Sequence, residues 1–160
     1  MLNVRLVCVG KMREKHYIDA FSEYSKRLSA YCKFEAEELP EFRLGDNPSD
    51  REVEAALARE AQEIEKRILP GSYVIAMCVE GRQLSSEELA GLLRDCAVTG
   101  KSRVCFIIGG SFGLHRSVKD RADLKLSMSK MTFPHHLARV MLAEQIYRGF
   151  SIIEGSRYHK

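Results

Sequence analysis

Strand-like and helix-like patterns of hydrophobic residues alternate along the whole chain. Continuous apolar runs, typical of buried strands, occupy residues 2–9, 73–79 and 104–108. Apolar and polar residues alternate over 31–39 and 124–128, as on a half-buried strand. The segments with helical spacing are 17–28, 49–68, 85–100, a short stretch at 117–122, and 135–148. Strands that alternate with helices predict a three-layer α/β sandwich with a mostly parallel sheet.

Two of these helices carry clear start signals. Ser49-Asp-Arg-Glu52 and Ser85-Ser-Glu-Glu88 are capping boxes, in which the serine and the glutamate each bond a backbone N–H at the start of the helix. Pro70-Gly71 ends the first of these two helices, because proline cannot continue it. The signals therefore predict the starts of two helices in the middle of the chain.

Length and composition indicate one globular domain over residues 1–160. A chain of this length can bury one core and is short for two. Its hydrophobic content of 45% is ordinary, and no apolar run approaches the roughly 20 residues that span a bilayer. The segment Met1–Gly10 lacks the basic region and the cleavage site of a signal peptide. We expect a cytoplasmic protein with no membrane partner.

Cysteine and charge patterns narrow the chemistry further. The five cysteines include no closely spaced pair, so neither a zinc site nor a disulfide framework is indicated, and we expect reduced thiols and no metal. Residues 1–80 hold 12 Lys and Arg against 15 Asp and Glu, a net charge of −3. Residues 81–160 hold 13 against 7, a net charge of +6. The basic half is a modest indication of a polyanionic partner, although a solvated surface would explain it equally well.

Three loops follow three of the predicted strands and could meet at one edge of the sheet. They are Gly81–Leu84, Gly109–Gly113 and Ser129–Phe133. In parallel α/β sheets ligands bind beyond the carboxyl ends of strands, although the glycines at 109–113 could serve turn geometry alone. The last loop is unusually apolar, since it includes Met131 and Phe133. Together the loops predict a pocket for a ligand with an apolar or aromatic part.

Single histidines and arginines give weaker indications. His135 and His136 begin the last predicted helix, where the helix dipole would lower the pKa of both rings and keep them neutral. Arg139 and Arg148 on that helix could be solvated or could bind phosphate through their guanidinium forks. The tail carries Tyr158 and His159, two ring side chains so close to the end that we expect it to dock on the domain.

Several of these segments resemble a known family. The matching stretches are Val7–Lys11, Ile107–His115, Leu126–His135, Arg139–Arg148 and Tyr158–Lys160. They are similar to the ribosomal RNA large subunit methyltransferase H family, and the likeness covers essentially the whole chain. Its members methylate N3 of a pseudouridine in large-subunit (23S) ribosomal RNA with S-adenosyl-L-methionine. They belong to the SPOUT class of α/β-knot methyltransferases.

The resemblance implies a fold that the patterns alone do not predict. In the SPOUT class the C-terminal part threads a trefoil knot, whereas chain connections are almost always unknotted. It also implies a homodimer with the cofactor cleft beside the subunit interface, and a substrate that is the assembled ribosome. The residues that match the cofactor-binding positions are Met77, Gly109, Met128, Ser129, Lys130, Met131, Thr132 and Phe133.

The same resemblance suggests residues near the target base. N3 of pseudouridine carries a proton that must leave before or as the nitrogen is methylated, so the site needs close positioning, either alone or with a base. Family likeness places Arg148, Tyr158 and His159 near the target nucleotide, with His135 as a further candidate. Arg148 would hold phosphate or base, and His159 could act as the base. For His135 we favour the simpler interpretation of a helix start.

Two other functions remain open from the residues. A nucleotide- or flavin-binding α/β enzyme would use the glycine turn for its cofactor, although the G-x-G-x-x-G spacing is missing. A non-catalytic ribosome-binding factor would bind ribosomes without transferring a methyl group.

Overall fold

The computed structural model describes residues 1–159 and shows five parallel strands in one sheet. Lys160, which ends both the expected domain and the Tyr158–Lys160 motif, lies outside the described residues. The strands are β1 (Asn3–Val9), β2 (Lys33–Leu39), β3 (Tyr73–Gln83), β4 (Arg103–Ile108) and β5 (Leu124–Ser127). Their order across the sheet is β2-β1-β4-β3-β5, and each neighbouring pair is parallel. The predicted parallel α/β architecture is therefore confirmed.

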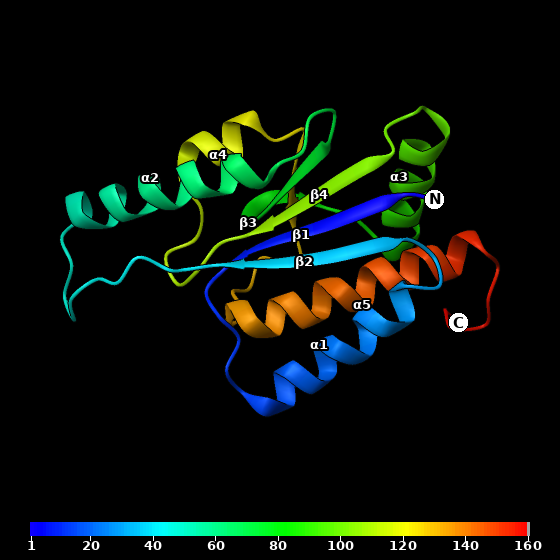
Figure 1. Ribbon diagram of the computed structural model, residues 1–160, viewed down its shortest axis with the longest axis horizontal. Helices are drawn as coiled ribbons and strands as arrows, with labels where there is room; N and C mark the ends of the chain where they lie inside the picture. Colours follow the sequence, from blue (N-terminus) through cyan, green and yellow to red (C-terminus); the bar gives the residue numbers. More distant parts are fainter. Residues whose placement is uncertain (160) are drawn as a thin grey trace.

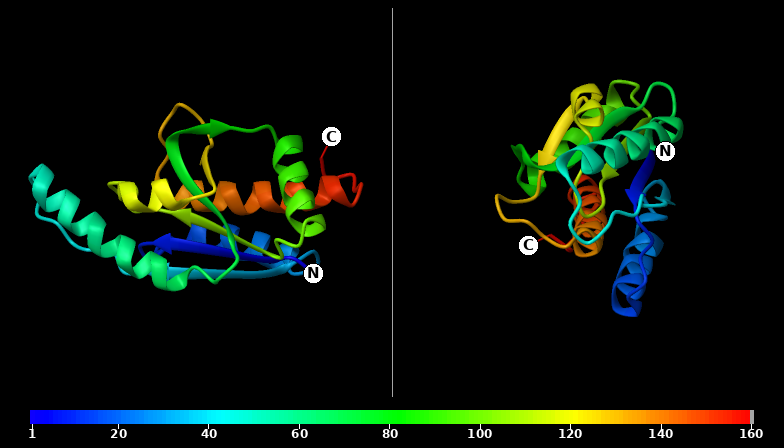
Figure 2. Two further views of the ribbon diagram at one scale, coloured as in Figure 1. Left: turned by 90° about the horizontal axis from the view of Figure 1, so that it is seen from above. Right: turned by 90° about the vertical axis from the view of Figure 1, so that its left-hand side faces the viewer.

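Helices cover both faces of the sheet (Figures 1 and 2). They are α1 (Lys15–Leu28), α2 (Asp50–Arg67), α3 (Ser86–Val98), α4 (Arg116–Arg121) and α5 (His135–Ile153). One core unites α1, α3 and α5 with one face of the sheet through residues such as Leu28, Leu93, Phe106 and Leu142. A second core joins α2 and α4 to the other face and includes Ile64, Ile107 and Val118. The three predicted layers are thus present.

Both predicted capping boxes start their helices. Ser49 Oγ accepts the Glu52 N–H at 3.1 Å, and the Glu52 carboxylate accepts the Ser49 N–H in return. Ser85 and Glu88 make the same reciprocal pair at the start of α3. These bonds satisfy N–H groups that the helix itself leaves without a partner.

The loop predicted at Gly81–Leu84 is wrong, because β3 continues through Gln83. The strand pairs with β5 up to Met77, bulges, and pairs with β5 again at Arg82 and Gln83. Gly81 makes the close approach possible, since a Cβ there would lie 2.7–2.8 Å from backbone atoms of Lys125 and Leu126. An extended second half of β3 therefore runs along β5 where the sequence indicated a simple turn.

The long helix α5 buries a different face from the one that its pattern indicated. Its buried residues are Arg139, Leu142, Ala143, Ile146, Gly149, Phe150 and Ser151. The helical spacing of the sequence places a stripe of Leu137, Val140, Met141, Glu144 and Tyr147 on one side of this helix, but these residues are only half-buried. Part of that stripe lines a groove of about 380 Å³ together with Tyr24 and Leu84. A half-exposed apolar stripe lies beside the core face, and the sequence pattern alone did not separate the two.

Arg139 is neither solvated nor placed to bind phosphate. Its side chain is 2% exposed, and it donates to Glu38 Oε2 at 2.6 Å and to the Gly10 carbonyl at 2.9 Å. The guanidinium thus joins α5 to the ends of β1 and β2. A buried arginine is tolerated only where its charge is paired in this way.

The cysteines form no disulfide among residues 1–159, and four of the five are buried. Burial raises the pKa of Cys8 and of Cys105 to about 12, so both remain neutral thiols. Cys78 is half-buried. No helix of residues 1–159 combines the length and the hydropathy needed to cross a membrane.

Candidate active site

A cavity of about 600 Å³ opens at the carboxyl ends of β3, β4 and β5. Its wall is formed by the bulged part of β3, by the turn after β4 and by the loop between β5 and α5. The lining residues that the sequence had singled out are Met77, Gly109, Met128, Ser129, Met131, Thr132, Phe133 and His135. Lys130 is exposed and does not line the cavity. The structure therefore brings together all but one of the residues expected to hold a cofactor.

The turn after β4 is compact and depends on Gly109. Gly110 and Gly113 form an isolated antiparallel bridge, with the Gly113 N–H donating to the Gly110 carbonyl at 3.0 Å. A Cβ on Gly109 would lie 2.5 Å from the Gly113 carbonyl carbon and closer still to its oxygen. These backbone atoms of Gly113 leave no room for a side chain at position 109. Glycine there permits the close approach of the two backbone segments.

The loop between β5 and α5 is held by its serines and exposes apolar side chains. Ser127 Oγ donates to the Ser129 carbonyl at 2.9 Å, and Ser129 Oγ accepts the Met131 N–H at 3.0 Å. Met131 is 69% exposed at the cavity mouth, and Phe112 from the facing turn is 52% exposed. Large apolar groups left exposed around a cavity are typical of a ligand site.

Glu41 supports the glycine turn, and sequence reasoning missed it. Its Oε1 accepts the Ser111 N–H at 2.9 Å, across 70 residues of chain. The same oxygen would lie 2.6 Å from a Cβ on Gly110, so the carboxylate sits directly against the turn. Glu41 comes from the long segment between β2 and α2, where Gly45-Asp-Asn-Pro48 indicates a loop. No local pattern indicated which distant backbone group it would bind.

His135 lies at the boundary between the cavity and the N-terminus of α5. Its ring is 4.2 Å from that of His136, centroid to centroid. Burial lowers the pKa of His135, and the neighbouring His136 lowers it further. The predicted direction of the shift is confirmed, but the first cause is burial, whereas the sequence had suggested the helix dipole. At neutral pH this ring carries no positive charge beside the cavity.

The lowered pKa gives a pH-dependent effect on folding. Because the folded protein binds a proton at His135 less readily than the unfolded chain, the His135 contribution to stability becomes unfavourable as pH falls below about 6.5. When the pH is lowered from 7.5 to 5.0, we expect the melting temperature of His135→Gln to fall less than that of the wild type. Thermal unfolding at both pH values tests this, with His16→Gln, an exposed histidine on α1, as the control. Equal losses in the wild type and His135→Gln would contradict it.

Arg148, Tyr158 and His159 form a separate cluster at the other end of α5. Tyr158 Oη donates to Glu144 Oε1 at 3.1 Å, and Arg148 Nε donates to the same oxygen at 2.9 Å. The Arg148 guanidinium lies 4.8 Å from the centre of the Tyr158 ring. His159 contacts Arg148 at 3.2 Å through Nδ1 and Glu87 at 2.8 Å through Nε2. The expected docking of the tail is thus confirmed for residues 158 and 159.

The two clusters are far apart within one protomer. His135 and Arg148 are 13 positions apart on one helix, which corresponds to about 20 Å at 1.5 Å per residue. The structure therefore does not bring Arg148, Tyr158 or His159 to the cavity of their own chain. Among residues 1–159 no group of three or more His, Cys, Asp or Glu side chains is arranged to hold a metal ion.

Comparisons with known proteins agree with this architecture. The family described as "Predicted SPOUT methyltransferase" matches residues 2–159. A relative from Clostridium beijerinckii, named ribosomal RNA large subunit methyltransferase H, is 51% identical over 99% of this chain and 100% of its own length. A relative of the same name from Streptococcus equi subsp. zooepidemicus is 43% identical over the same shares.

Solved structures share the fold at low sequence identity. A tRNA (m1G37) methyltransferase from Aquifex aeolicus has a TM-score of 0.51 and 17% identity, over 91% of this chain and 69% of that one. A probable methyltransferase from Bordetella pertussis Tohama I has a TM-score of 0.57 and 15% identity, over 92% and 95%. The fold is the knotted α/β fold that the resemblance implied. The chain belongs to the SPOUT methyltransferases, in the family of ribosomal RNA large subunit methyltransferase H.

Proposed function

We propose that this protein transfers a methyl group from S-adenosyl-L-methionine to N3 of a pseudouridine in 23S ribosomal RNA, within the assembled ribosome. The observation that carries the proposal is the cavity at the carboxyl edge of the sheet, lined by the loops that match the family pattern. Close relatives bear the name of a ribosomal RNA methyltransferase. Residues 1–160 would act as one methyltransferase domain, and the ribosomal substrate would place the activity in the cytoplasm.

The cavity suits S-adenosyl-L-methionine in size and chemistry. Its volume of about 600 Å³ lies within the range of small-molecule sites. Met77, Met128 and Phe133 supply apolar walls for an adenine ring, and Gly109 lets backbone N–H and C=O groups approach the ligand closely. Ser129 and Thr132 add polar groups, while Lys130 would act only from the rim. When bound, the cofactor supplies a methyl group on a positively charged sulfonium.

The side chains on α5 and the tail suit a substrate that must be held and deprotonated. Burial raises the pKa of Tyr158, so its phenol stays protonated and acts as a hydrogen-bond donor. His159 and His135 are therefore the side chains of this set that could accept the N3 proton. Arg148 would hold a phosphate or the base with the part of its fork that faces away from Glu144. A neutral His135 also avoids placing a second positive charge beside the sulfonium.

The separation of the two clusters supports a homodimer. If both act on one nucleotide, the tail must come from a second copy, because about 20 Å separates them in one chain. The half-buried stripe of α5, with Val140 and Met141 beside Tyr24, offers an apolar surface for a second copy. In a two-fold dimer each subunit would then complete the site of the other.

Methyl transfer from radiolabelled cofactor tests the function directly. Assembled ribosomes from cells that lack the enzyme should accept label at a single pseudouridine, whereas naked 23S RNA should accept little. Stable association with ribosomes without transfer would favour a non-catalytic binding factor. Binding of flavin or NAD in place of S-adenosylhomocysteine would favour the other alternative, a nucleotide-dependent enzyme.

A further inference from the structure

A second cavity of about 640 Å³ lies next to the first, on the side of β1 and β2. One wall is the β1–α1 connection, Gly10–Glu14, and the other is the segment Pro40–Gly45 that leads towards α2. The two cavities share Ser111, Phe112 and His135 in their walls, so the second extends from the mouth of the first. We call the second cavity the side groove.

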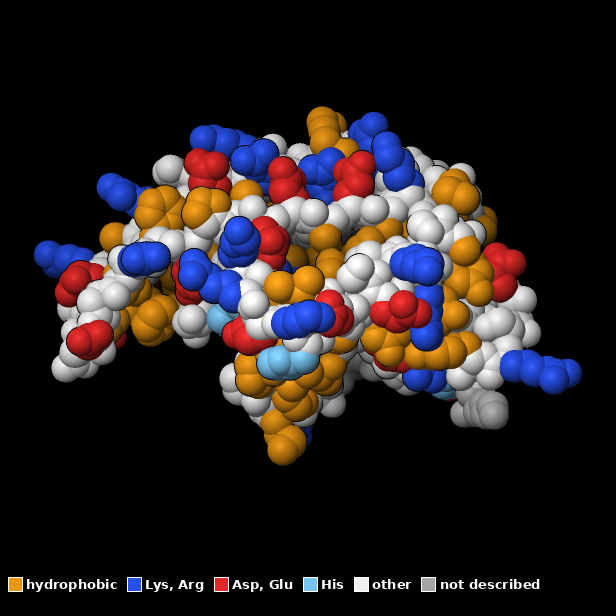
Figure 3. Space-filling view, turned by 60° about the horizontal axis from the view of Figure 1, so that its bottom comes forward, with side chains coloured by type: hydrophobic (Ala, Val, Ile, Leu, Met, Phe, Trp, Pro, Cys, Tyr) orange, Lys and Arg blue, Asp and Glu red, His pale blue; other side chains and the backbone are white. Residues whose placement is uncertain are grey.

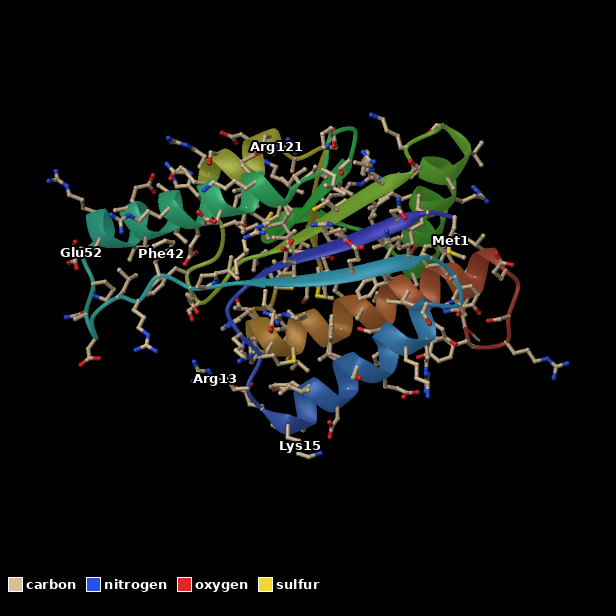
Figure 4. The ribbon with its side chains drawn as sticks, viewed as in Figure 1. Met1, Arg13, Lys15, Phe42, Glu52 and Arg121 are labelled. Atoms are coloured by element: carbon tan, nitrogen blue, oxygen red, sulfur yellow. The ribbon has the colours of Figure 1, made fainter. Side chains whose placement is uncertain are left out.

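The side groove is visible on the surface of the molecule. Figure 3 shows a hollow between the projecting arm formed by α2 with its preceding segment and the N-terminal end of α1. Histidine side chains are seen at the inner end of this hollow. Arg13 and Phe42 lie on the two segments that border it, on the same side of the molecule (Figure 4).

In the side groove the acidic side chains have hydrogen-bond partners within the protein, whereas the lysine and arginine side chains have none in the described part of the chain. Glu14 Oε2 pairs with His136 Nδ1 at 3.1 Å, and Glu41 accepts the Ser111 N–H. The cationic side chains of the groove are Lys11, Arg13 and Arg43, all exposed. None of the three makes a side-chain hydrogen bond or ion pair within residues 1–159, whereas many surface cations elsewhere do, such as Lys15 with Asp19. The groove thus presents three cations without a direct side-chain partner in this range, together with the two carboxylates of Glu14 and Glu41.

An aromatic ring stands where the two cavities join. Phe112 is 52% exposed at the tip of the glycine turn, although a phenylalanine loses free energy by facing water. Unpaired RNA bases stack on such rings, while their phosphates bind Lys and Arg. An exposed ring beside three free cations is therefore the pattern expected for single-stranded RNA.

We propose that the side groove binds the ribose–phosphate backbone of the nucleotides that flank the methylated one. Lys11, Arg13 and Arg43 contact phosphates, and Phe112 stacks on a neighbouring unpaired base. The proposal rests on the proposed function, since it takes the first cavity as the methyl-transfer site. RNA is favoured over an acidic protein segment because the groove opens from that cavity and adds an aromatic face to its cations.

The test measures how salt affects the Michaelis constant for assembled ribosomes. A cation that contacts phosphate releases counterions, so its removal should weaken binding and flatten the salt dependence by about one unit in the log–log slope. For Arg13→Ala/Arg43→Ala we expect KM for assembled ribosomes to rise at least about tenfold, with the slope reduced by about two. The affinity for S-adenosylhomocysteine, measured by calorimetry, should change less than about twofold, because neither arginine lines the first cavity.

Controls separate this proposal from the proposed function. Lys101→Ala removes an exposed cation from the α3–β4 connection, at the opposite edge of the sheet, and should leave KM and the slope unchanged. Arg13→Lys/Arg43→Lys keeps the charge and should retain most of the salt slope. If the wild type transfers methyl groups and the alanine double variant keeps its KM and slope, the side groove does not bind RNA. If the wild type transfers none, the proposed function itself fails.

Discussion

Gly109→Ala should slow methyl transfer by at least about 100-fold and weaken S-adenosylhomocysteine binding, because a misplacement of reacting groups by about 1 Å lowers the rate by that factor. A Cβ at this position meets the Gly113 carbonyl, and both partners are backbone, so neither can rotate away. The turn must open, and its N–H and C=O groups then leave the positions from which they face the cavity. Calorimetric titration with S-adenosylhomocysteine measures the loss.

Two other glycines provide a graded control for this substitution. Gly110→Ala meets the end of the Glu41 side chain, which can rotate, so an intermediate loss is expected together with loss of the Glu41–Ser111 bond. Gly91→Ala lies in α3 with no atom closer than 4.0 Å to the added Cβ. It should keep full affinity and gain about 0.5–1 kcal/mol in stability. If all three variants bind equally well, the glycine turn does not hold the cofactor.

Arg148→Ala should abolish turnover while leaving cofactor binding intact. We expect kcat/KM on assembled ribosomes to fall by about 100-fold or more, as when a donor that stabilises the reacting groups is removed. S-adenosylhomocysteine should bind within about twofold of the wild type, because Arg148 is assigned to the target nucleotide and the cofactor to the cavity loops. Arg94→Ala, an exposed position on α3, serves as the control and should retain activity. Full turnover by Arg148→Ala would contradict the assignment of Arg148 to the active site.

Mixing two inactive variants shows where Arg148 acts. A mixed dimer of Gly109→Ala and Arg148→Ala subunits has one intact cavity and one intact tail, on different chains. If the tail serves the partner's cavity, that dimer contains one complete site. Random reassembly should then restore about a quarter of wild-type activity, because about half of the dimers are mixed and each has one site of two. No recovery would mean that cavity and tail must lie on the same chain.

The sequence predicted the elements well because their signals are local. The capping boxes at Ser49 and Ser85 depend on residues three positions apart, and the buried strands depend on short apolar runs. The cavity residues could also be predicted from the sequence, since loops after parallel strands meet at one edge of the sheet. The knot was predicted only from the family resemblance, because the general rules for chain connections argue against knots.

Other features depend on contacts between distant residues and left no local signal. The Arg139 side chain reaches Gly10 and Glu38, and Glu41 reaches Ser111, across 70 to 129 positions of chain. Charge counts by halves were misleading in the same way. The cations of the side groove, unpaired within residues 1–159, come from residues 1–80, the half with net charge −3, because the neighbouring Glu14 and Glu41 contact His136 and the Ser111 N–H and not these cations. The charge of that surface depends on which side chains lie near one another in the fold, and not on the net charge of a stretch of sequence.

The bond from Glu41 to Ser111 has a thermodynamic consequence for the order of events. Glu41 belongs to the outer wall of the side groove, and Ser111 belongs to the turn that lines the first cavity. A ligand that draws the Pro40–Gly45 segment towards itself therefore also pulls on the turn. Linkage is reciprocal, so whatever factor RNA imposes on cofactor affinity, the cofactor imposes on RNA affinity. If RNA binds the side groove as proposed, the Glu41 carboxylate would couple RNA binding to cofactor binding.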